Sequence, residues 1–221
     1  MFALWQLQAF TADLRVCSAG FMRVMAYVLA GGLSSRMGQD KSQLRVGGRT
    51  MLEHAREFVG TIASETAVVG SQEHLGGYAE VVRDVWRQCG PLGGIHAALA
   101  HARSEWNLIF AVDQFWRDPG VLRLLCDVAH TVSAECWAVV PQIDGRAEPL
   151  CALYRKAFGA AAEEALRRGE RKIGRLLTPE RTRWISEEEM RVAGVSPEVR
   201  NVNTPEDYAE LMQDWGASNK P

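Results

Sequence analysis

The chain has 221 residues, of which 47% are hydrophobic and 24% charged, as expected for a globular protein with a substantial core. The formal net charge of -2 excludes a general attraction to nucleic acid or to an anionic membrane, so any affinity for phosphate must come from a local site. Five scattered cysteines without Cys-x-x-Cys spacing predict reduced thiols, not a disulfide framework or a zinc cluster.

Residues 1–22 precede the first convincing strand and are apolar but interrupted, by Gln6, Gln8, Asp13 and Arg15. They lack a basic start followed by an unbroken apolar run, so they favour an appended extension over a signal peptide or a membrane span. We therefore expect a cytoplasmic protein with one domain over residues 23–215, an N-terminal extension outside its core and a tail over residues 216–221.

Short apolar runs alternate with amphipathic segments along the rest of the chain. The predicted strands are residues 24–29, 65–69, 80–82, 107–112, 136–140 and 150–154. The predicted helices are residues 50–60, 91–102, 119–131, 155–168 and 205–215, the first with a capping box of Thr50 and Glu53. This alternation predicts an α/β layered fold with a mostly parallel central sheet, in which ligands bind at the carboxyl ends of the strands.

The segment LAGGLSSRMGQDK, residues 29–41, is the most informative stretch of the chain. Gly31 and Gly32 follow a predicted strand, where backbone can approach a ligand without a Cβ in the way and N–H groups can surround an anion. Arg36 and Lys41 add two positive charges that can hold a triphosphate. A glycine pair alone is more often a surface turn, but the full run favours a phosphate site that is neither a dinucleotide fingerprint nor a Walker loop.

Asp113 directly follows the predicted strand of residues 107–112. Phosphoryl transfer uses Mg²⁺ to bridge phosphates, and Mg²⁺ binds one or two carboxylates together with water and phosphate oxygens. A carboxylate beside a phosphate loop meets that need. The alternative is a turn or N-cap aspartate for the next helix.

Together these motifs resemble the molybdenum cofactor guanylyltransferases, the MobA family. Residues 29–41 are similar to that family's L-A-G-G-x-S-x-R-M-G-x-D-K, and Gly32 and Asp40 separate the run from sugar, isoprenoid and cytidylyl relatives, which usually carry L-A-A-G and, in the first two, Pro-Lys. The segments GPLGG, EPLCALY and NVNTPED, at residues 90–94, 148–154 and 201–207, resemble further motifs of the family. The resemblance runs from about Val24 to about Met212 without large gaps.

This resemblance implies a three-layer, Rossmann-like nucleotidyltransferase fold and the transfer of GMP from GTP to the terminal phosphate of molybdopterin, with release of pyrophosphate. It implies a set of GTP contacts at Leu29, Ala30, Gly31, Lys41, Asp84 and Asp113. Lys41, Arg36 and Asp113 would act in catalysis, with Asp113 also holding Mg²⁺. The expected partners are GTP, molybdopterin and, transiently, proteins that supply the cofactor or mature molybdoenzymes; we expect a monomer.

One departure from the family pattern follows Asp113. The family usually reads D-x-P-[FYL]-L, whereas this chain has Phe115 in place of the proline, which removes a rigid turn. Two alternatives stay open: an enzyme of the same fold that uses CTP or a sugar phosphate, and a non-catalytic pterin carrier or chaperone. Also open are pterin contacts by Asn201, Asn203 and the basic cluster of residues 167–172, which is more simply a solvated helix end.

Overall fold

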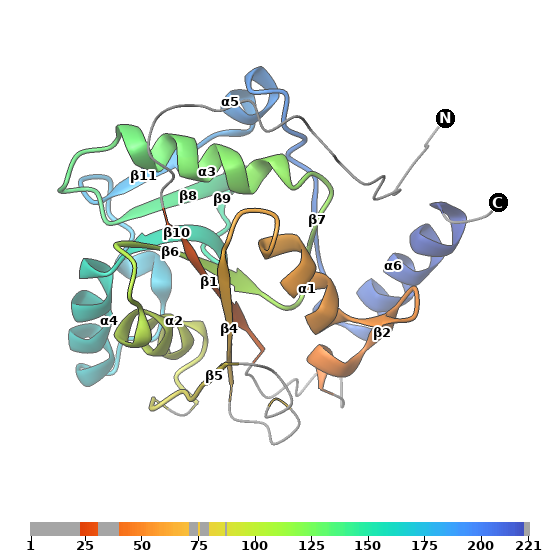
Figure 1. Cartoon of the computed structure of the whole chain (residues 1–221), viewed down its shortest axis with the longest axis horizontal. Helices are drawn as coiled ribbons and strands as arrows, with labels where there is room; N and C mark the ends of the chain where they lie inside the picture. The colour runs from red at the N-terminus through yellow and green to blue at the C-terminus, as the bar shows by residue number, and fades with distance from the viewer. Residues whose placement is uncertain (1–22, 31–39, 71–74, 76–79, 87, 219–221) are drawn as a thin grey trace.

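A computed structural model describes residues 23–30, 40–70, 75, 80–86 and 88–218, the side chains of residues 216–218 excepted (Figure 1). Its strands in the first half are β1 (Met25–Leu29), β2 (Arg45–Val46), β3 (Arg49–Thr50), β4 (Glu65–Val69), β5 (Val81–Val82) and β6 (Trp106–Ala111). Those in the second half are β7 (Gln114–Trp116), β8 (Ala138–Ile143), β9 (Arg146–Ala147), β10 (Cys151–Arg155), β11 (Thr182–Ile185) and β12 (Val199–Asn201).

The α-helices of the described chain are α1 (Met51–Val59), α2 (Pro91–His101), α3 (Gly120–Thr131), α4 (Ala157–Arg167), α5 (Glu187–Val192) and α6 (Pro205–Ser218). Short 3₁₀ turns lie at η1 (Lys41–Gln43) and η3 (Ile173–Arg175). None of the helices in this part of the chain is long and apolar enough to cross a membrane.

Most strands form one central sheet, in the order β11-β8-β10-β6-β1-β4-β5, with β9 paired to β8. Strand β1 pairs in parallel with β4 and β6, β4 pairs in parallel with β5, and β11 pairs in parallel with β8. Strand β10 is antiparallel to both of its neighbours, β6 and β8. The prediction of a mostly parallel sheet is confirmed.

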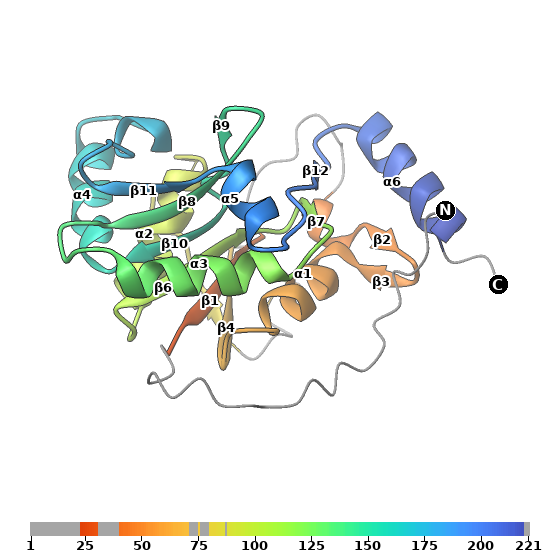
Figure 2. The ribbon, with the colours of Figure 1, turned by 90° about the horizontal axis from the view of Figure 1, so that it is seen from above.

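Helices cover both faces of this sheet because its strands are apolar on both sides. Along β1, Met25, Tyr27 and Leu29 pack on the face with α2 and α4, whereas Ala26 and Val28 pack on the face with α1 and α3. The two views show α3 and α1 on one side of the sheet and α2 and α4 on the other (Figures 1 and 2). This is the three-layer α/β fold that the sequence predicts.

The first helix begins with the expected capping box. The Thr50 hydroxyl accepts a hydrogen bond from the Glu53 N–H at 3.1 Å, and the Glu53 carboxylate accepts one from the Thr50 N–H at 2.6 Å. Two N–H groups of the first turn are thereby satisfied. Thr50 also ends the β2–β3 hairpin, whose strands were not among the predicted elements.

The C-terminal helix α6 packs on this hairpin (Figure 2). The Tyr208 hydroxyl donates to the Arg45 carbonyl oxygen at 2.6 Å, and the Trp215 ring lies over Gly47. A Cβ at Gly47 would meet Trp215 Nε1 at 2.1 Å, so the indole needs a glycine there. The helix therefore holds in place the segment that follows residues 31–41.

We predict that Gly47→Ala destabilises the protein more than Gly48→Ala does. Both glycines have positive φ, 57° and 86°, so alanine is strained at either position, but a Cβ at Gly48 meets nothing within 4 Å. Displacing Trp215 should add about 1 kcal/mol or more, the lower end of the usual cost of overpacking. Urea unfolding of both variants measures the difference, and equal losses would show that the Trp215 contact adds nothing.

Candidate functional site

The carboxyl ends of β1, β4 and β6 meet at one edge of the sheet. The Ala30 N–H donates to the Val69 carbonyl oxygen at 2.9 Å, and the Val112 N–H donates to that of Leu29 at 3.1 Å. Leu29 and Ala30 lie at this edge and are nearly buried, with 8% and 5% of their surface exposed. Gly31 and Arg36 lie outside the described residues, and their roles stay predictions.

Lys41 and Asp113, predicted from separate motifs, are in contact at this edge. The Lys41 ammonium lies 2.6 Å from Asp113 Oδ2 and donates a second hydrogen bond to Asn203 Oδ1 at 3.0 Å. The side chains of Lys41 and Asp113 are only 15% and 23% exposed. Two charges held with so little water are shielded less than surface charges, so the attraction between them is stronger.

Asp40, which distinguishes the motif in the sequence, has a clear local role. Its carboxylate accepts from the Ser42 N–H at 2.9 Å and from the Ser42 hydroxyl at 2.7 Å, which caps the 3₁₀ turn that begins at Lys41. Ser42 is fully buried. The turn thereby fixes the backbone from which the Lys41 side chain extends.

Asp113 is held by a small ribbon in which β7 pairs with β12. The Val202 N–H donates to the Asp113 carbonyl oxygen at 2.9 Å, and the Arg117 N–H donates to the Glu198 carbonyl oxygen at 3.0 Å. Between these two rungs, Phe115 lies opposite Arg200. Hydrogen-bonded rungs alternate in an antiparallel pair, so Phe115 occupies a rung that uses its N–H, which a proline lacks. In this chain a strand ladder therefore takes the place of the rigid turn.

Asn203 is positioned by the start of α6. Asp207 accepts hydrogen bonds from the Asn203 and Thr204 N–H groups at 2.7 and 2.8 Å, and the Asp207 N–H donates to the Thr204 hydroxyl at 3.1 Å. These backbone hydrogen bonds, with smaller help from the Lys41 charge, lower the pKa of Asp207. The residues of the NVNTPED motif thus cap a helix and also direct one amide to Lys41.

Asp84 lies farther along the same edge, after β5 and against the first turn of α2. It accepts from the Trp86 N–H at 2.8 Å, and burial raises its pKa although this bond and His96 oppose the rise. A Cβ at Gly93 would meet the Trp86 carbonyl oxygen at 2.9 Å and Asp84 Oδ2 at 3.0 Å. The glycines of the GPLGG motif therefore let Asp84 approach the helix. No contact joins Asp84 to Lys41 or Asp113 in the described structure.

Glu148 and Gln114 were not among the predicted site residues, and Asn201 was considered only as an open pterin contact. Glu148 accepts a hydrogen bond from Gln114 Nε2 at 2.7 Å, and the Asn201 side chain lies near enough to lower its pKa. Burial raises the pKa of Glu148, and the charge of Asp113 raises it further, against the effect of the two amides. Glu148 and Asn201 belong to the quoted EPLCALY and NVNTPED motifs, but only the antiparallel direction of β10 brings Glu148 to this edge.

The carboxylates present suit a magnesium ion shared with phosphates. Among the described residues no group of three or more His, Cys, Asp or Glu could hold a metal ion by itself. Asp113 supplies carboxylate oxygens at the sheet edge, with Glu148 near enough for their charges to interact. One or two protein carboxylates, completed by water and phosphate oxygens, are the usual surroundings of Mg²⁺.

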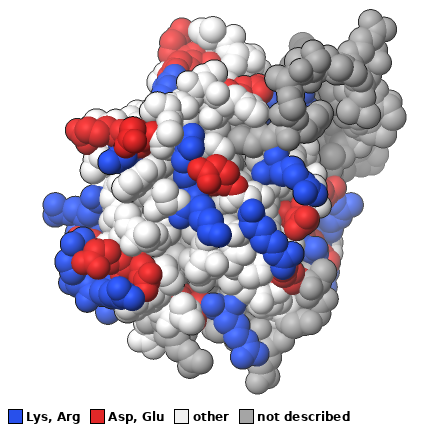
Figure 3. All heavy atoms as spheres, turned by 60° about the vertical axis from the view of Figure 1, so that its left-hand side comes forward, with Lys and Arg blue, Asp and Glu red and all other residues white. Residues whose placement is uncertain are grey.

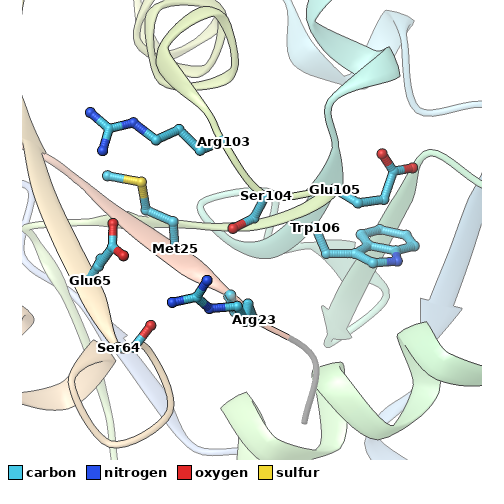
Figure 4. A pocket seen from close by; sticks show the side chains of 9 residues that line it. Arg23, Met25, Ser64, Glu65, Arg103, Ser104, Glu105 and Trp106 are labelled. Carbon is cyan, nitrogen blue, oxygen red and sulfur yellow. The ribbon is translucent and has the colours of Figure 1, made fainter. Parts of the chain in front are cut away.

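A cavity and a group of paired surface charges lie away from this edge. A cavity of about 380 Å³ borders the opposite edge of the sheet, between Met25, Glu65 and Trp106, the first residues of β1, β4 and β6 (Figure 4). The basic residues Arg167 and Arg168 pair with Glu163 and Glu164 on α4, and positive and negative side chains are interspersed on that face (Figure 3). Such paired, exposed charges are typical of a solvated helix end.

Comparison with known proteins shows which protein family the chain is similar to. Residues 26–184 match the family described as the MobA-like NTP transferase domain. A probable molybdenum cofactor guanylyltransferase of Pelotomaculum thermopropionicum is 32% identical over 192 residues, which cover 86% of this chain and 92% of that protein. A molybdenum cofactor guanylyltransferase of Pseudomonas aeruginosa is 33% identical over 184 residues, covering 81% and 89%. The crystal structure of molybdopterin-guanine dinucleotide biosynthesis protein A from Archaeoglobus fulgidus matches with a TM-score of 0.73 at 28% identity and covers 88% of this chain and all of that one.

Gly93→Ala should destabilise the protein and displace Asp84. The Trp86 carbonyl oxygen is backbone and cannot move away cheaply, so we expect a loss of about 1–3 kcal/mol, as for other overpacked sites. Gly174→Ala is the matched control, because a Cβ at Gly174 meets nothing within 4 Å. Urea unfolding of the two variants tests this, and an unfolding free energy for Gly93→Ala equal to that of the control would contradict it.

Asp84→Asn should change how stability depends on pH. The folded state raises the pKa of Asp84 above its usual 3.8, so the folded protein binds this proton more tightly than the unfolded chain does. The resulting stabilisation is fully present below pH 3.8 and is lost as the pH rises through the folded pKa. Melting temperatures of parent and variant, measured from acid to neutral pH, should therefore shift in favour of the variant as pH rises. A shift in favour of the parent would refute this.

Proposed function

The chain belongs to the MobA-like NTP transferase family and is a nucleotidyltransferase, and from this premise we propose that it is a molybdenum cofactor guanylyltransferase. In this reaction GMP passes from GTP to the terminal phosphate of molybdopterin, and pyrophosphate is released. The relatives named above support the assignment. The observation that carries it is the contact of Lys41 with Asp113 at the carboxyl edge of the sheet.

The nucleotide would bind along the ends of β1, β5 and β6. Leu29, Ala30 and Gly31 would border the nucleoside and its phosphates, and Asp84 would accept hydrogen bonds from guanine or ribose. Lys41 has three N–H donors, and two of them go to Asp113 and Asn203 in the structure. The third donor, together with Arg36, would hold the phosphates.

Asp113 would hold Mg²⁺ with its carboxylate. When bound, Mg²⁺ neutralises phosphate charge and makes the α-phosphorus easier to attack. Asp113 would serve both as the carboxylate that holds the ion and as the counter-charge of Lys41. Asn203, which accepts a hydrogen bond from Lys41, would limit the range of positions of the ammonium.

The transfer itself is an in-line displacement at the α-phosphorus of GTP. An oxygen of the molybdopterin phosphate forms the new bond, and the bond to the β-phosphate oxygen breaks, so pyrophosphate leaves with the electron pair. The acceptor oxygen is already anionic, so no side chain has to remove a proton. Lys41 and Arg36 would stabilise the charge on the transferring and leaving phosphates, and the site acts chiefly by positioning and charge.

We propose that the enzyme acts as a monomer in the cytoplasm, with residues 1–22 outside its catalytic domain of residues 23–215. Its substrates are GTP and molybdopterin. Transient contact with proteins that supply the cofactor or mature molybdoenzymes would pass the pterin along.

Lys41→Ala should lower turnover about 100- to 1000-fold, the usual cost of losing one group that stabilises charge in a transition state. The assay is pyrophosphate release from GTP with molybdopterin and Mg²⁺. Lys156→Ala is the control: Lys156 is exposed, and its N–H donates to the Glu105 carbonyl oxygen at the opposite edge of the sheet. Its rate should stay close to that of the parent.

Two outcomes would contradict the proposal. A preference for CTP or a sugar phosphate over GTP and molybdopterin would assign the chain to another activity of the same fold. Tight pterin binding without pyrophosphate release would favour a carrier.

A further inference from the structure

Glu148 lies where the central sheet and the β7–β12 ribbon meet. Glu148 lies between β9 and β10. Because β10 runs antiparallel to β6, the amino end of β10 lies at the edge of the sheet where β6 ends. Its backbone is fixed on both sides: the Glu148 N–H donates to the Pro141 carbonyl oxygen at 2.9 Å, and the Cys151 N–H donates to that of Glu148 at 3.2 Å. The side chain thus extends from a rigid base.

The carboxylate of Glu148 interacts with both strands of the ribbon. It accepts a hydrogen bond from Gln114 Nε2 of β7 at 2.7 Å, and the nearby Asn201 side chain of β12 lowers its pKa. Gln114 and Asn201 are directly opposite each other in the ladder. One acidic group therefore lies against both residues of a single rung.

The next rung of the same ribbon carries the proposed catalytic group. Asp113 precedes β7 and accepts the Val202 N–H at 2.9 Å, and Asn203 follows directly. Asp113 and Asn203 are the two residues that bond the Lys41 ammonium, at 2.6 and 3.0 Å. The position of the ribbon therefore sets the position of both acceptors relative to Lys41.

The surroundings of Glu148 disfavour a charged side chain, so its contact with the ribbon is not explained by packing alone. The carboxyl group is half-buried and close enough to Asp113 to feel its charge, and both conditions disfavour a second negative charge there. The Gln114 hydrogen bond and the nearby Asn201 amide offset this cost, since hydrogen bonds to a charged acceptor are stronger than those between neutral groups. A neutral side chain would fill the same place without that cost, so we attribute the presence of a carboxylate to its interaction with the ribbon.

We propose that Glu148 is a positioning residue, which fastens the β7–β12 ribbon to the edge of the central sheet and so holds Asp113 and Asn203 against Lys41. Its effect on turnover rests on the function proposed above. Its effect on the ribbon does not, so the two can be tested separately.

The direct test is amide hydrogen exchange of the intact protein, comparing the parent with Glu148→Ala and Glu148→Gln. Losing the hydrogen bond from Gln114 and the interaction with Asn201 should speed exchange in residues 113–117 and 198–203 by about tenfold, because the lost hydrogen bond involves a charged group. Glutamine keeps one acceptor oxygen, so Glu148→Gln should give a smaller increase. Exchange in β1 and β4, which do not contact Glu148, should not change.

Glu198→Gln is the matched control, because Glu198 lies at the other end of the same ribbon. Its carboxylate pairs with Arg117 at 2.6 Å and is 63% exposed, so its loss should leave exchange near residues 113 and 203 unchanged. If Glu148→Ala fails to fold, Glu148→Gln carries the test. Unchanged exchange in the ribbon of a folded Glu148 variant overturns the proposal.

A binding measurement tests the link to Lys41. With a fluorescent GTP analogue and Mg²⁺, Glu148→Ala should weaken affinity in the parent background and have much less effect when Asn203→Ala is already present. Additive losses in affinity would show that Glu148 acts elsewhere, which overturns the positioning role. If exchange and binding follow expectation while the parent releases no pyrophosphate with GTP and molybdopterin, the positioning role stands and the proposed function fails.

Discussion

The contact between Lys41 and Asp113 joins two segments that are 72 residues apart in the sequence, and the arrangement of the whole edge depends on it. Both side chains are largely buried, so each has lost much of its water, and removing either partner would leave an isolated charge that is costly to keep. The Asn203 amide adds a second acceptor and helps satisfy the ammonium. The pair is therefore held in a defined geometry, and under the proposed function the third N–H of Lys41 would contact a phosphate.

The position of each residue in this contact is fixed by hydrogen bonds close to that residue. A carboxylate cap at Asp40 fixes the turn from which Lys41 extends, and a second cap at Asp207 fixes the backbone before α6 that carries Asn203. Asp113 is fixed by the rung that it shares with Val202. These are hydrogen bonds between neighbouring residues or paired strands, so each fixes its part of the contact locally; the Asp207 carboxylate also interacts with the charge of Lys41.

The second half of the chain brings side chains to this edge that a purely parallel sheet would place at the opposite edge. Strand β10 reverses direction, which brings the residues before it, Glu148 among them, to the edge where the parallel strands end. The β7–β12 ribbon then crosses from the end of β6 to the start of α6, and α6 packs against the β2–β3 hairpin that follows Lys41. Segments from both halves of the chain thus meet at this edge, and their relative positions come from packing.

Local signals in the sequence predicted most strands of the central sheet and the helices that cover it, but β2, β3, β7, β9, β11, β12 and α5 were not predicted. Apolar runs such as that before Leu29 predicted the strands, the Thr50–Glu53 pair predicted a helix start, and the positions of Lys41 and Asp113 after separate strands predicted where they would lie. Such features depend on neighbours a few residues away, and so they can be read directly from the chain. Only the tertiary structure decided the direction of β10, the pairing of Phe115 in a ladder with β12 and the approach of Glu148 and Asn203 to the site. These depend on contacts between residues far apart in the sequence, for which no spacing in a single chain carries a signal.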